Sequence, residues 1–161
     1  MLRGFELGDL NYFLRFFSNP DASQHVGGPS GREDTWRRML AGAALWQLTG
    51  IGMWAIERRS DSATIGHIGF FDFLRDCEPS IAGSPEMGWI LAPEAHGQGL
   101  ATEACVAILS WFEEQFGKLP IWAMISPGND ASTRLAEKLG FTRQSDGSYR
   151  DKPQTYWLRQ A

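Results

Sequence analysis

The sequence contains few of the residues that mark disulfide-rich, metal-binding or nucleic-acid-binding proteins. Its 161 residues include 2 cysteines, Cys77 and Cys105, and 3 histidines. Two cysteines make neither a disulfide framework nor a zinc pattern, and His25 and His67 show no ligand spacing with each other or with acidic residues. The 15 Lys and Arg are outnumbered by 19 Asp and Glu, for a net charge of −4, whereas nucleic acids are bound by clustered cations. We therefore predict no metal site and no nucleic-acid partner.

Long apolar runs are also absent. No stretch is long enough to cross a bilayer, and the first residues, Met1-Leu2-Arg3-Gly4, do not resemble a signal peptide. Repeats, low-complexity tracts and linkers are missing as well, and the composition is 43% hydrophobic and 21% charged. These features predict a cytoplasmic protein without a membrane partner, folded as a single domain over residues 1–161. Composition does not distinguish a monomer from a homodimer.

Helical and strand-like periodicities follow one another along the chain and predict an α/β fold (α+β mixed) around one mixed sheet. Helices are expected at Leu10–Ser18, Glu33–Trp46, Gly97–Phe116 and Ala131–Leu139. Strands are expected at Leu2–Phe5, Gly52–Glu57, Thr64–Phe73, Glu86–Leu91, Pro120–Ile125, Phe141–Gln144 and Thr155–Leu158, with loops at 25–31 and 74–85. Because a helix joins the strand ending at Leu91 to the strand at 120–125, these two strands are expected to be parallel.

The most informative segment, His96-Gly97-Gln98-Gly99-Leu100-Ala101, joins that strand to that helix. The first N–H groups of a helix have no partner inside it, and the helix dipole adds positive potential there. Glycines let a ligand approach the backbone without meeting a Cβ. The segment therefore predicts a phosphate-bearing ligand.

Three kinds of phosphate-binding loop were compared with this segment. The P-loop requires Lys and Ser/Thr after its last glycine, where this chain has Leu100-Ala101. The dinucleotide fingerprint requires a small residue at position 102, which is Thr102, and an acidic residue for the ribose, and none fits. The coenzyme A loop of GNAT-type N-acetyltransferases, Gln/Arg-x-x-Gly-x-Gly/Ala, is matched at Gly99 and Ala101 and departs from the pattern at His96. A glycine-rich turn before an ordinary helix remains the alternative.

Three more segments resemble the same family, and they occur in the family's order. Pro85-Glu86-Met87-Gly88-Trp89 resembles its E-x-G-aromatic strand. Ala101-Thr102-Glu103-Ala104 matches the A-T-E-A of its RimJ/RimL-like branch. Asn129-Asp130-Ala131-Ser132, followed by the run from Ala136 to Phe141, resembles its N-x-x-S…K-x-G-F segment. The chain therefore resembles GNAT-superfamily N-acetyltransferases of the RimJ/RimL-like group over residues 86–141.

The resemblance implies a mostly antiparallel sheet with a splayed parallel strand pair, about four helices and acetyl-CoA as donor substrate, without a metal. Pantetheine would bind the backbone near Ile90 and Leu91, and Asn129 and Ser132 would contact the cofactor. The pyrophosphate would lie on N–H groups of His96, Gly97, Gln98, Gly99, Leu100, Ala101 and Thr102. Two readings stay open: Asn129 can be a plain helix cap, and His96 can offer a charge or only its N–H.

The chemistry implied is direct attack of a primary amine on the thioester. A backbone N–H at Leu91 could stabilise the oxyanion, and Glu86 is the candidate base. The alternative for Glu86 is a surface carboxylate at a strand end. Tyr149 is the candidate acid by resemblance, and Tyr156 is its rival, although a tyrosine in the last strand more often serves packing.

The leading hypothesis is an acetyl-CoA-dependent N-acetyltransferase acting on a protein N-terminus or a small-molecule amine. A catalytically silent acyl-CoA-binding module and a nucleotide-binding regulator are the alternatives. The acceptor would be covered by the first two helices and the loop at 74–85. Carboxylates and aromatics of these regions would suit a cation: Trp36, Trp46, Asp72, Asp76 and Glu78.

Overall fold

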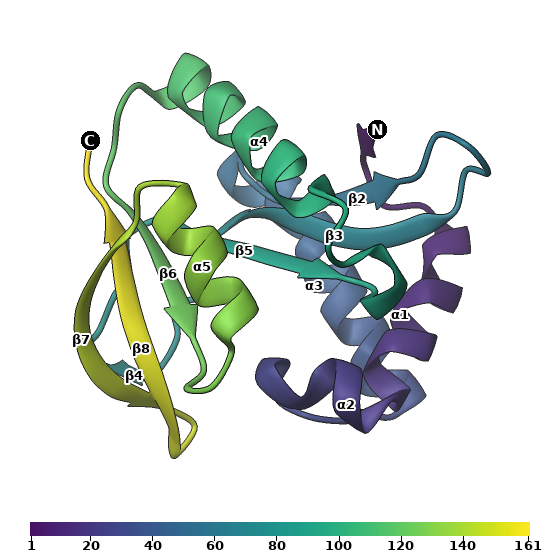
Figure 1. The fold of residues 1–161 in the computed structure, drawn as a ribbon, viewed down its shortest axis with the longest axis horizontal. Helices are drawn as coiled ribbons and strands as arrows, with labels where there is room; N and C mark the ends of the chain where they lie inside the picture. The colour runs from purple at the N-terminus through teal and green to yellow at the C-terminus, as the bar shows by residue number, and fades with distance from the viewer. The chain divides into compact units, whose positions relative to one another are not determined.

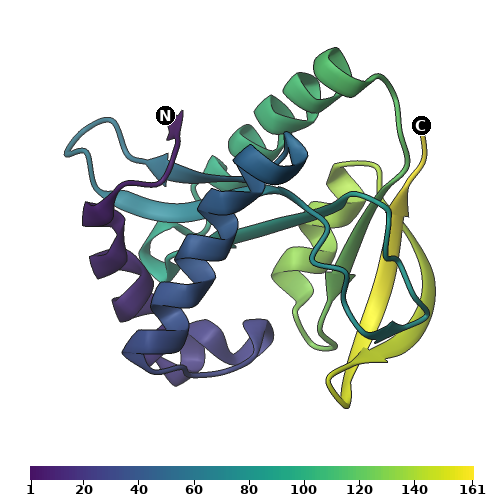
Figure 2. The same ribbon diagram turned by 180° about the vertical axis from the view of Figure 1, so that it is seen from behind.

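The computed structural model describes residues 1–161 and contains eight strands, five α-helices and three short 3-10 helices (Figures 1 and 2). The strands are β1 (Leu2–Arg3), β2 (Met53–Glu57), β3 (Thr64–Phe71), β4 (Cys77–Glu78), β5 (Glu86–Leu91), β6 (Ile121–Ile125), β7 (Thr142–Tyr149) and β8 (Lys152–Arg159). The α-helices are α1 (Leu10–Ser18), α2 (Pro20–Ser23), α3 (Arg32–Thr49), α4 (Leu100–Phe116) and α5 (Asp130–Lys138). The 3-10 helices are η1 (Leu7–Asp9), η2 (Gln24–Val26) and η3 (Pro93–Ala95).

The strands form one mixed sheet in the order β1-β2-β3-β5-β6-β8-β7-β4. The parallel pairing of β5 with β6 is confirmed, and its register is recorded at a single pair, Glu86 with Trp122. The pairs β1–β2, β2–β3, β6–β8, β7–β8 and β4–β7 are antiparallel. The predicted α/β fold with a mostly antiparallel sheet is therefore confirmed, with five α-helices where about four were expected.

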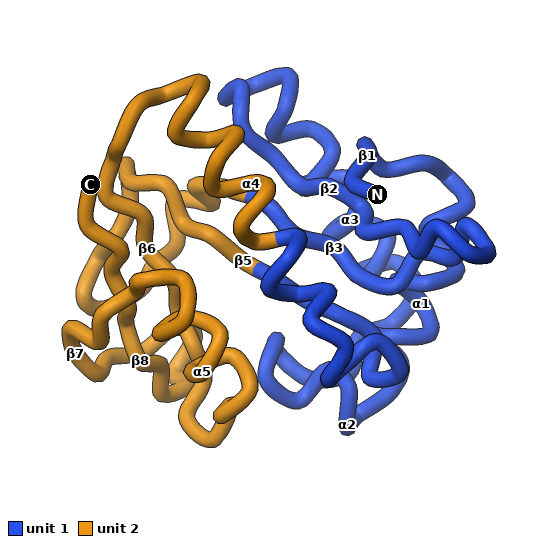
Figure 3. The backbone as a smooth tube through the Cα atoms, turned by 45° about the horizontal axis from the view of Figure 1, so that its top comes forward, with its two compact units in different colours: residues 1–69, 89–104 blue, residues 70–88, 105–161 orange.

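The chain divides into two compact units, coloured in Figure 3. Unit 1 comprises residues 1–69 and 89–104, and unit 2 comprises residues 70–88 and 105–161. The boundaries fall within β3, β5 and α4, so each of these elements contributes residues to both units.

Unit 1 has an aromatic core between α1, α3 and β3. Helix α1 buries Tyr12, Phe13, Phe16 and Phe17, because their spacing places them on one face of the helix. The two helices α1 and α3 pack side by side (Figure 2). His67 of β3 is buried against these rings, and its own ring stacks on that of Phe13 at 4.7 Å between centroids.

Unit 2 contains the hairpin of β7 and β8, drawn in yellow-green and yellow in Figure 1. Both strands are longer than predicted, because β7 is largely exposed and its polar residues give no apolar alternation. The turn between them, Arg150-Asp151, takes φ values of 52° and 58°, a two-residue turn that glycine or asparagine usually occupies. Strand β4, which pairs with the edge of β7, lies inside the segment predicted as a loop, and two residues are too few to show a period.

Local conformation explains one wrong helix boundary and one helix cap that was not predicted. Helix α4 begins at Leu100 rather than Gly97, because Gly97 and Gly99 take φ values of 72° and 76° that a right-handed helix excludes. Asn19, expected only to end α1, also caps the short α2, since its Oδ1 accepts hydrogen bonds from the N–H groups of Asp21 and Ala22.

Candidate functional site

The segment between β5 and α4, in unit 1, presents unpartnered backbone donors. The first helical hydrogen bond runs from the N–H of Glu103 to the carbonyl of Gly99. The N–H groups of Leu100, Ala101 and Thr102 therefore precede the helical ladder and have no acceptor in the protein. They carry the positive end of a 17-residue helix.

Two glycines leave open space in front of these donors. A Cβ at Gly97 or Gly99 would meet no protein atom within 4 Å. Their positive φ explains why glycine is present, and the empty space shows that packing within the protein does not require it. The side chain of Gln98 folds back, with Nε2 donating to the carbonyl of Glu94 at 2.8 Å. The geometry fits an anion that needs close access to backbone N–H groups.

His96 is engaged by both its backbone and its ring. Its N–H donates to the carbonyl of Pro93 at 3.1 Å, and its ring Nε2–H donates to the carbonyl of Leu91 at 3.1 Å. The His96 N–H predicted to hold phosphate therefore already has an acceptor within the protein. The imidazole instead ties the start of the loop to the end of β5.

The end of β5 points its backbone groups in two directions. The N–H of Ala92 donates to Ile65 of β3, and the carbonyl of Ile90 would lie 2.6 Å from a Cβ on Gly66 of β3. Because successive residues of a strand turn their backbone groups to opposite sides, Leu91 directs its N–H away from β3. Of the two predicted pantetheine contacts, Leu91 is the better placed donor, and Ile90 is turned toward β3.

In unit 2, Asn129 is the N-cap of α5, and its Oδ1 accepts a hydrogen bond from the N–H of Ser132 at 3.2 Å. The predicted capping is thus confirmed. It links the two polar residues of this segment to each other, and it leaves the amide nitrogen of Asn129 for other partners.

Glu86, at the start of β5 and in unit 2, is only 6% exposed. The alternative of a surface carboxylate is therefore wrong. Arg75 donates from Nε to Glu86 Oε2 at 2.9 Å. Burial raises the pKa of Glu86 to about 7, with the Arg75 charge opposing the rise and Asp72 adding to it. A carboxyl group that titrates near neutral pH suits a general base.

The two candidate acids differ in their environment. Tyr156 is buried, its OH donates to the carbonyl of Ser148 at 3.1 Å, and burial raises its pKa. Tyr149 ends β7 and places its ring 4.7 Å from the guanidinium carbon of Arg75. Both tyrosines thus lie in the part of unit 2 that contains Glu86, and Tyr149 has the freer hydroxyl.

Sequence reasoning missed Arg75. It lies in a segment predicted as a loop, eleven residues before Glu86, and no short motif contains both. The available signal was the aromatic-rich run Phe71-Asp72-Phe73-Leu74-Arg75, which reads equally well as a loop with solvated charges.

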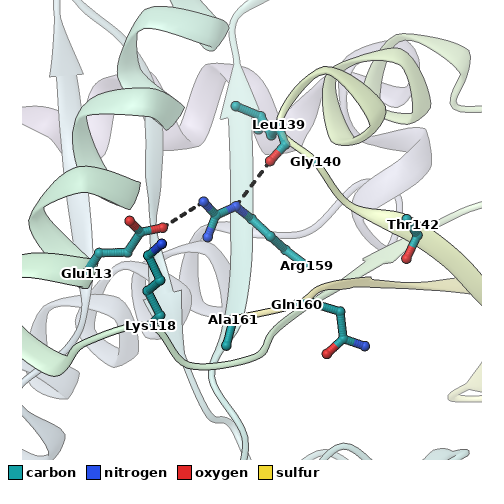
Figure 4. Close-up of a pocket in the computed structure, with 8 residues that line it drawn as sticks. All are labelled: Glu113, Lys118, Leu139, Gly140, Thr142, Arg159, Gln160 and Ala161. Atoms are coloured by element: carbon teal, nitrogen blue, oxygen red, sulfur yellow. Dashed lines mark hydrogen bonds and ion pairs between the residues drawn. The ribbon is translucent and has the colours of Figure 1, made fainter.

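A surface hollow in unit 2 contains none of the predicted site residues. Glu113 of α4 and Arg159 of β8 form an ion pair at 2.6 Å across it, and Arg159 also donates to the carbonyl of Leu139 (Figure 4). Its other lining residues are Lys118, Gly140, Thr142, Gln160 and Ala161. No group of three or more His, Cys, Asp and Glu residues could hold a metal ion, and none of the helices is long and apolar enough to cross a membrane.

Comparisons with known proteins identify the family. The model of the acetyltransferase (GNAT) domain matches residues 1–142. The uncharacterized N-acetyltransferase YoaA of Bacillus subtilis (strain 168) is 28% identical over 138 residues, which cover 84% of this chain and 75% of that protein. A solved acetyltransferase from Agrobacterium tumefaciens str. C58 has 28% identity and a TM-score of 0.85, with 99% of this chain and 90% of that chain covered.

The structure of RimL, a ribosomal L7/L12 alpha-N-protein acetyltransferase, has the same fold. Its TM-score is 0.78 at 16% identity, with 99% of this chain and 89% of that chain covered. The predicted likeness to the RimJ/RimL group thus extends to the three-dimensional structure. The chain belongs to the GNAT family of acetyltransferases.

Proposed function

We propose that this enzyme is an acetyl-CoA-dependent N-acetyltransferase that transfers the acetyl group to a primary amine by direct attack. The observation that carries the proposal is the set of three unpartnered N–H groups at the start of α4, behind two glycines with open space at their Cβ positions. A pyrophosphate needs several N–H donors and close backbone approach. In this proposal residues 97–102 hold the pyrophosphate, and His96 holds the loop in place.

The acetyl-transfer chemistry needs an oxyanion donor and a base. Leu91 supports the first role, because its N–H is directed away from β3. Glu86 supports the second, because burial raises its pKa to about 7 while one of its oxygens is free of hydrogen bonds. The two residues lie on the same strand, β5.

Asn129 and Ser132 are proposed to contact the cofactor from the start of α5, and Tyr149 to protonate the leaving thiolate. Tyr156 is the second candidate acid, but its OH already donates to a carbonyl. The 161 residues are proposed to act as one acetyltransferase domain. The cytoplasmic location stays a prediction, and monomer and homodimer remain alternatives.

The acceptor class proposed is a protein N-terminus or a small-molecule amine. The solved RimL carries a name that describes acetylation of a protein N-terminus, and its fold likeness supports the first of these. A panel of peptides and small amines, read by release of free thiol, tests the class. Binding of acetyl-CoA without turnover on any amine would favour the silent acyl-CoA-binding module.

The donor site is tested by calorimetry with acetyl-CoA and by Gly99→Asp. Aspartate at this position adds a Cβ where φ is 76° and a negative charge beside the proposed pyrophosphate, so affinity is expected to fall at least 100-fold. Gly117→Asp is the matched control, since this glycine also has a positive φ of 75° and lies at the other end of α4. Unchanged acetyl-CoA affinity in Gly99→Asp would place the phosphates elsewhere, and tighter binding of ATP or NAD would favour a nucleotide-binding regulator.

A further inference from the structure

The guanidinium of Arg75 is surrounded by three aromatic rings and one carboxylate, all in unit 2. Its central carbon lies 4.7 Å from the ring centroid of Tyr149, 5.4 Å from Phe73 and 5.5 Å from Phe71. Its Nε donates to Glu86 Oε2 at 2.9 Å. The Arg75 side chain is 20% exposed and that of Glu86 8%, so the ion pair is mostly shielded from water.

The rings hold Arg75 without competing for its hydrogen bonds. An aromatic face attracts a cation but offers no lone pair of the strength of a carboxylate. Arg75 has no hydrogen-bond acceptor in the protein other than Glu86. The guanidinium is thus fixed in place by stacking, while Glu86 is its one anionic partner.

The Phe71 ring lies close to a glycine of the neighbouring strand. A Cβ on Gly88, two residues after Glu86, would lie 2.9 Å from Cε1 of the Phe71 ring. Real Cβ atoms do not approach carbon atoms so closely, so a side chain at position 88 would require the outer edge of the Phe71 ring to shift. The strand that carries Glu86 therefore also supports the aromatic surroundings of Arg75.

Few charged or titratable groups act on Glu86. Arg75 and Asp72 come from the segment after β3, and Tyr156 of β8 feels the Glu86 charge together with Cys77 and Glu78 of β4. Arg75 is the one cation in this set. Burial favours the neutral carboxylic acid, and Arg75 favours the carboxylate.

We propose that Arg75 is a positioning residue for Glu86, which keeps this carboxyl group ionised near neutral pH and orients its second oxygen, Oε1, for the acceptor. The inference rests on the proposed function in that Glu86 is taken as the base. Oε2 is tied to Arg75, and Oε1 accepts no hydrogen bond within the protein. Arg75 touches neither donor nor acceptor in this proposal.

Arg75 keeps its positive charge throughout the reaction and neither gives nor takes a proton. The amine nitrogen forms a bond to the thioester carbonyl carbon and gives one proton to Glu86 Oε1. The carbon–sulfur bond then breaks, and its electron pair leaves on the coenzyme A sulfur. The sulfur takes a proton from Tyr149 or from water. Before the next cycle Glu86 loses its proton to solvent, and Tyr149, where it was the donor, regains one from solvent.

The first test is the pH dependence of turnover in Arg75→Gln, Arg75→Lys and Arg150→Gln. Arg150 is the matched control, because it also stacks on Tyr149, at 5.2 Å, but does not contact Glu86. In Arg75→Gln the acid limb of the pH–turnover profile is expected to move up by one pH unit or more, which lowers turnover about tenfold on that limb. Arg75→Lys should restore part of the shift, Arg150→Gln should match the wild type, and the KM for acetyl-CoA should stay within about twofold.

The second test does not depend on activity. The Glu86 carboxyl carbon is titrated by ¹³C NMR in glutamate-labelled wild type and Arg75→Gln, with Glu86→Gln used to assign the signal. A higher Glu86 pKa in Arg75→Gln is expected, and equal pKa values would overturn the proposal. If the NMR shift is present while turnover shows no matching pH shift, the coupling stands and Glu86 is not the base. Equal loss of turnover in Arg75→Gln at every pH, with no NMR shift, would mean that Arg75 only stabilises the fold.

Discussion

Two buried ionisable side chains, His67 in unit 1 and Glu86 in unit 2, differ in what surrounds them. In unit 1, His67 is buried among Phe5, Tyr12, Phe13 and Phe17, and its Nδ1 has no hydrogen-bond partner. In unit 2, Glu86 is equally buried but has a cation at 2.9 Å. Burial favours the neutral form of both groups, so it lowers the pKa of His67 to about 3 and raises that of Glu86 to about 7.

The different surroundings of His67 and Glu86 indicate a packing role for His67 and a chemical role for Glu86. A histidine with a pKa near 3 is neutral at every physiological pH, and its surroundings provide rings for stacking rather than polar groups for proton exchange. Glu86 changes charge near neutral pH and keeps one oxygen unpaired. Burial alone therefore does not identify a catalytic group, whereas a buried group with a single opposing charge and a free polar atom is a candidate.

The largest expected effect concerns stability in acid. His67 has a lower pKa in the folded than in the unfolded chain, so the folded state resists protonation. The free energy of unfolding that depends on neutral His67 is therefore fully present above about pH 6.5 and is lost as the pH falls toward 3. Relative to His67→Gln, the wild type should lose about 1.4 kcal/mol of unfolding free energy per pH unit, up to about 5 kcal/mol in all. Urea unfolding of both proteins between pH 7 and pH 4 measures the difference. Parallel curves would show that the pKa of His67 is not lowered in the folded chain.

The next effect concerns turnover. Glu86→Gln keeps the size of the side chain but removes the base, so turnover is expected to fall about 10²- to 10³-fold with acetyl-CoA affinity nearly unchanged. In the wild type, turnover should rise with pH through about 7, because the carboxylate is the active form. Steady-state kinetics with matched calorimetry tests both points. Turnover within a few-fold of wild type at all pH values would remove Glu86 as base and leave it with a role closer to that of His67.

The smallest effect is the opposite pH dependence of stability at Glu86. Its folded pKa is raised above the unfolded value of 4.5, so the stability it contributes is present below about pH 4.5 and lost as pH rises through about 7. Relative to Glu86→Gln, the wild type should lose up to about 3 kcal/mol of unfolding free energy over this interval. The loss is smaller if Arg75 moves closer to the ionised carboxylate and stabilises it. Thermal or urea unfolding from pH 4.5 to 8 checks the sign. A rise in relative stability over the same interval would mean that Arg75 outweighs burial.

The elements with strong local signals were predictable from the sequence. Helix α1 was predicted at Leu10–Ser18 and β5 at Glu86–Leu91, and both have these bounds in the structure. For α1, the spacing of the apolar residues indicates a helix and Asn19-Pro20 marks its end. For β5, the prolines on either side mark the ends of the strand. Strand β4 and the Arg150-Asp151 turn were missed, because their conformations depend on pairing with β7 and β8 rather than on local preference.

In the candidate site, too, the features set by local sequence were predictable and the contacts made by the fold were not. The donor segment at 96–102 was predictable because glycines and a helix start are local features, although the engagement of the His96 N–H was not. The burial of Glu86 and its pairing with Arg75 depend on side chains brought together by the fold. Nothing in the spacing of residues 75 and 86 indicates a contact, so the positioning residue became visible only in three dimensions.

Gly88 changes how the E-x-G pattern of this strand should be interpreted in other sequences. Its missing Cβ makes room for the Phe71 ring, which in turn lies against the Arg75 guanidinium. Three positions should therefore covary across an alignment of related chains: glycine at 88, an aromatic residue at 71 and arginine at 75. Relatives with alanine or a larger residue at 88 are expected to lack the aromatic side chain and the arginine together. They would have to set the charge of the strand's glutamate by other means.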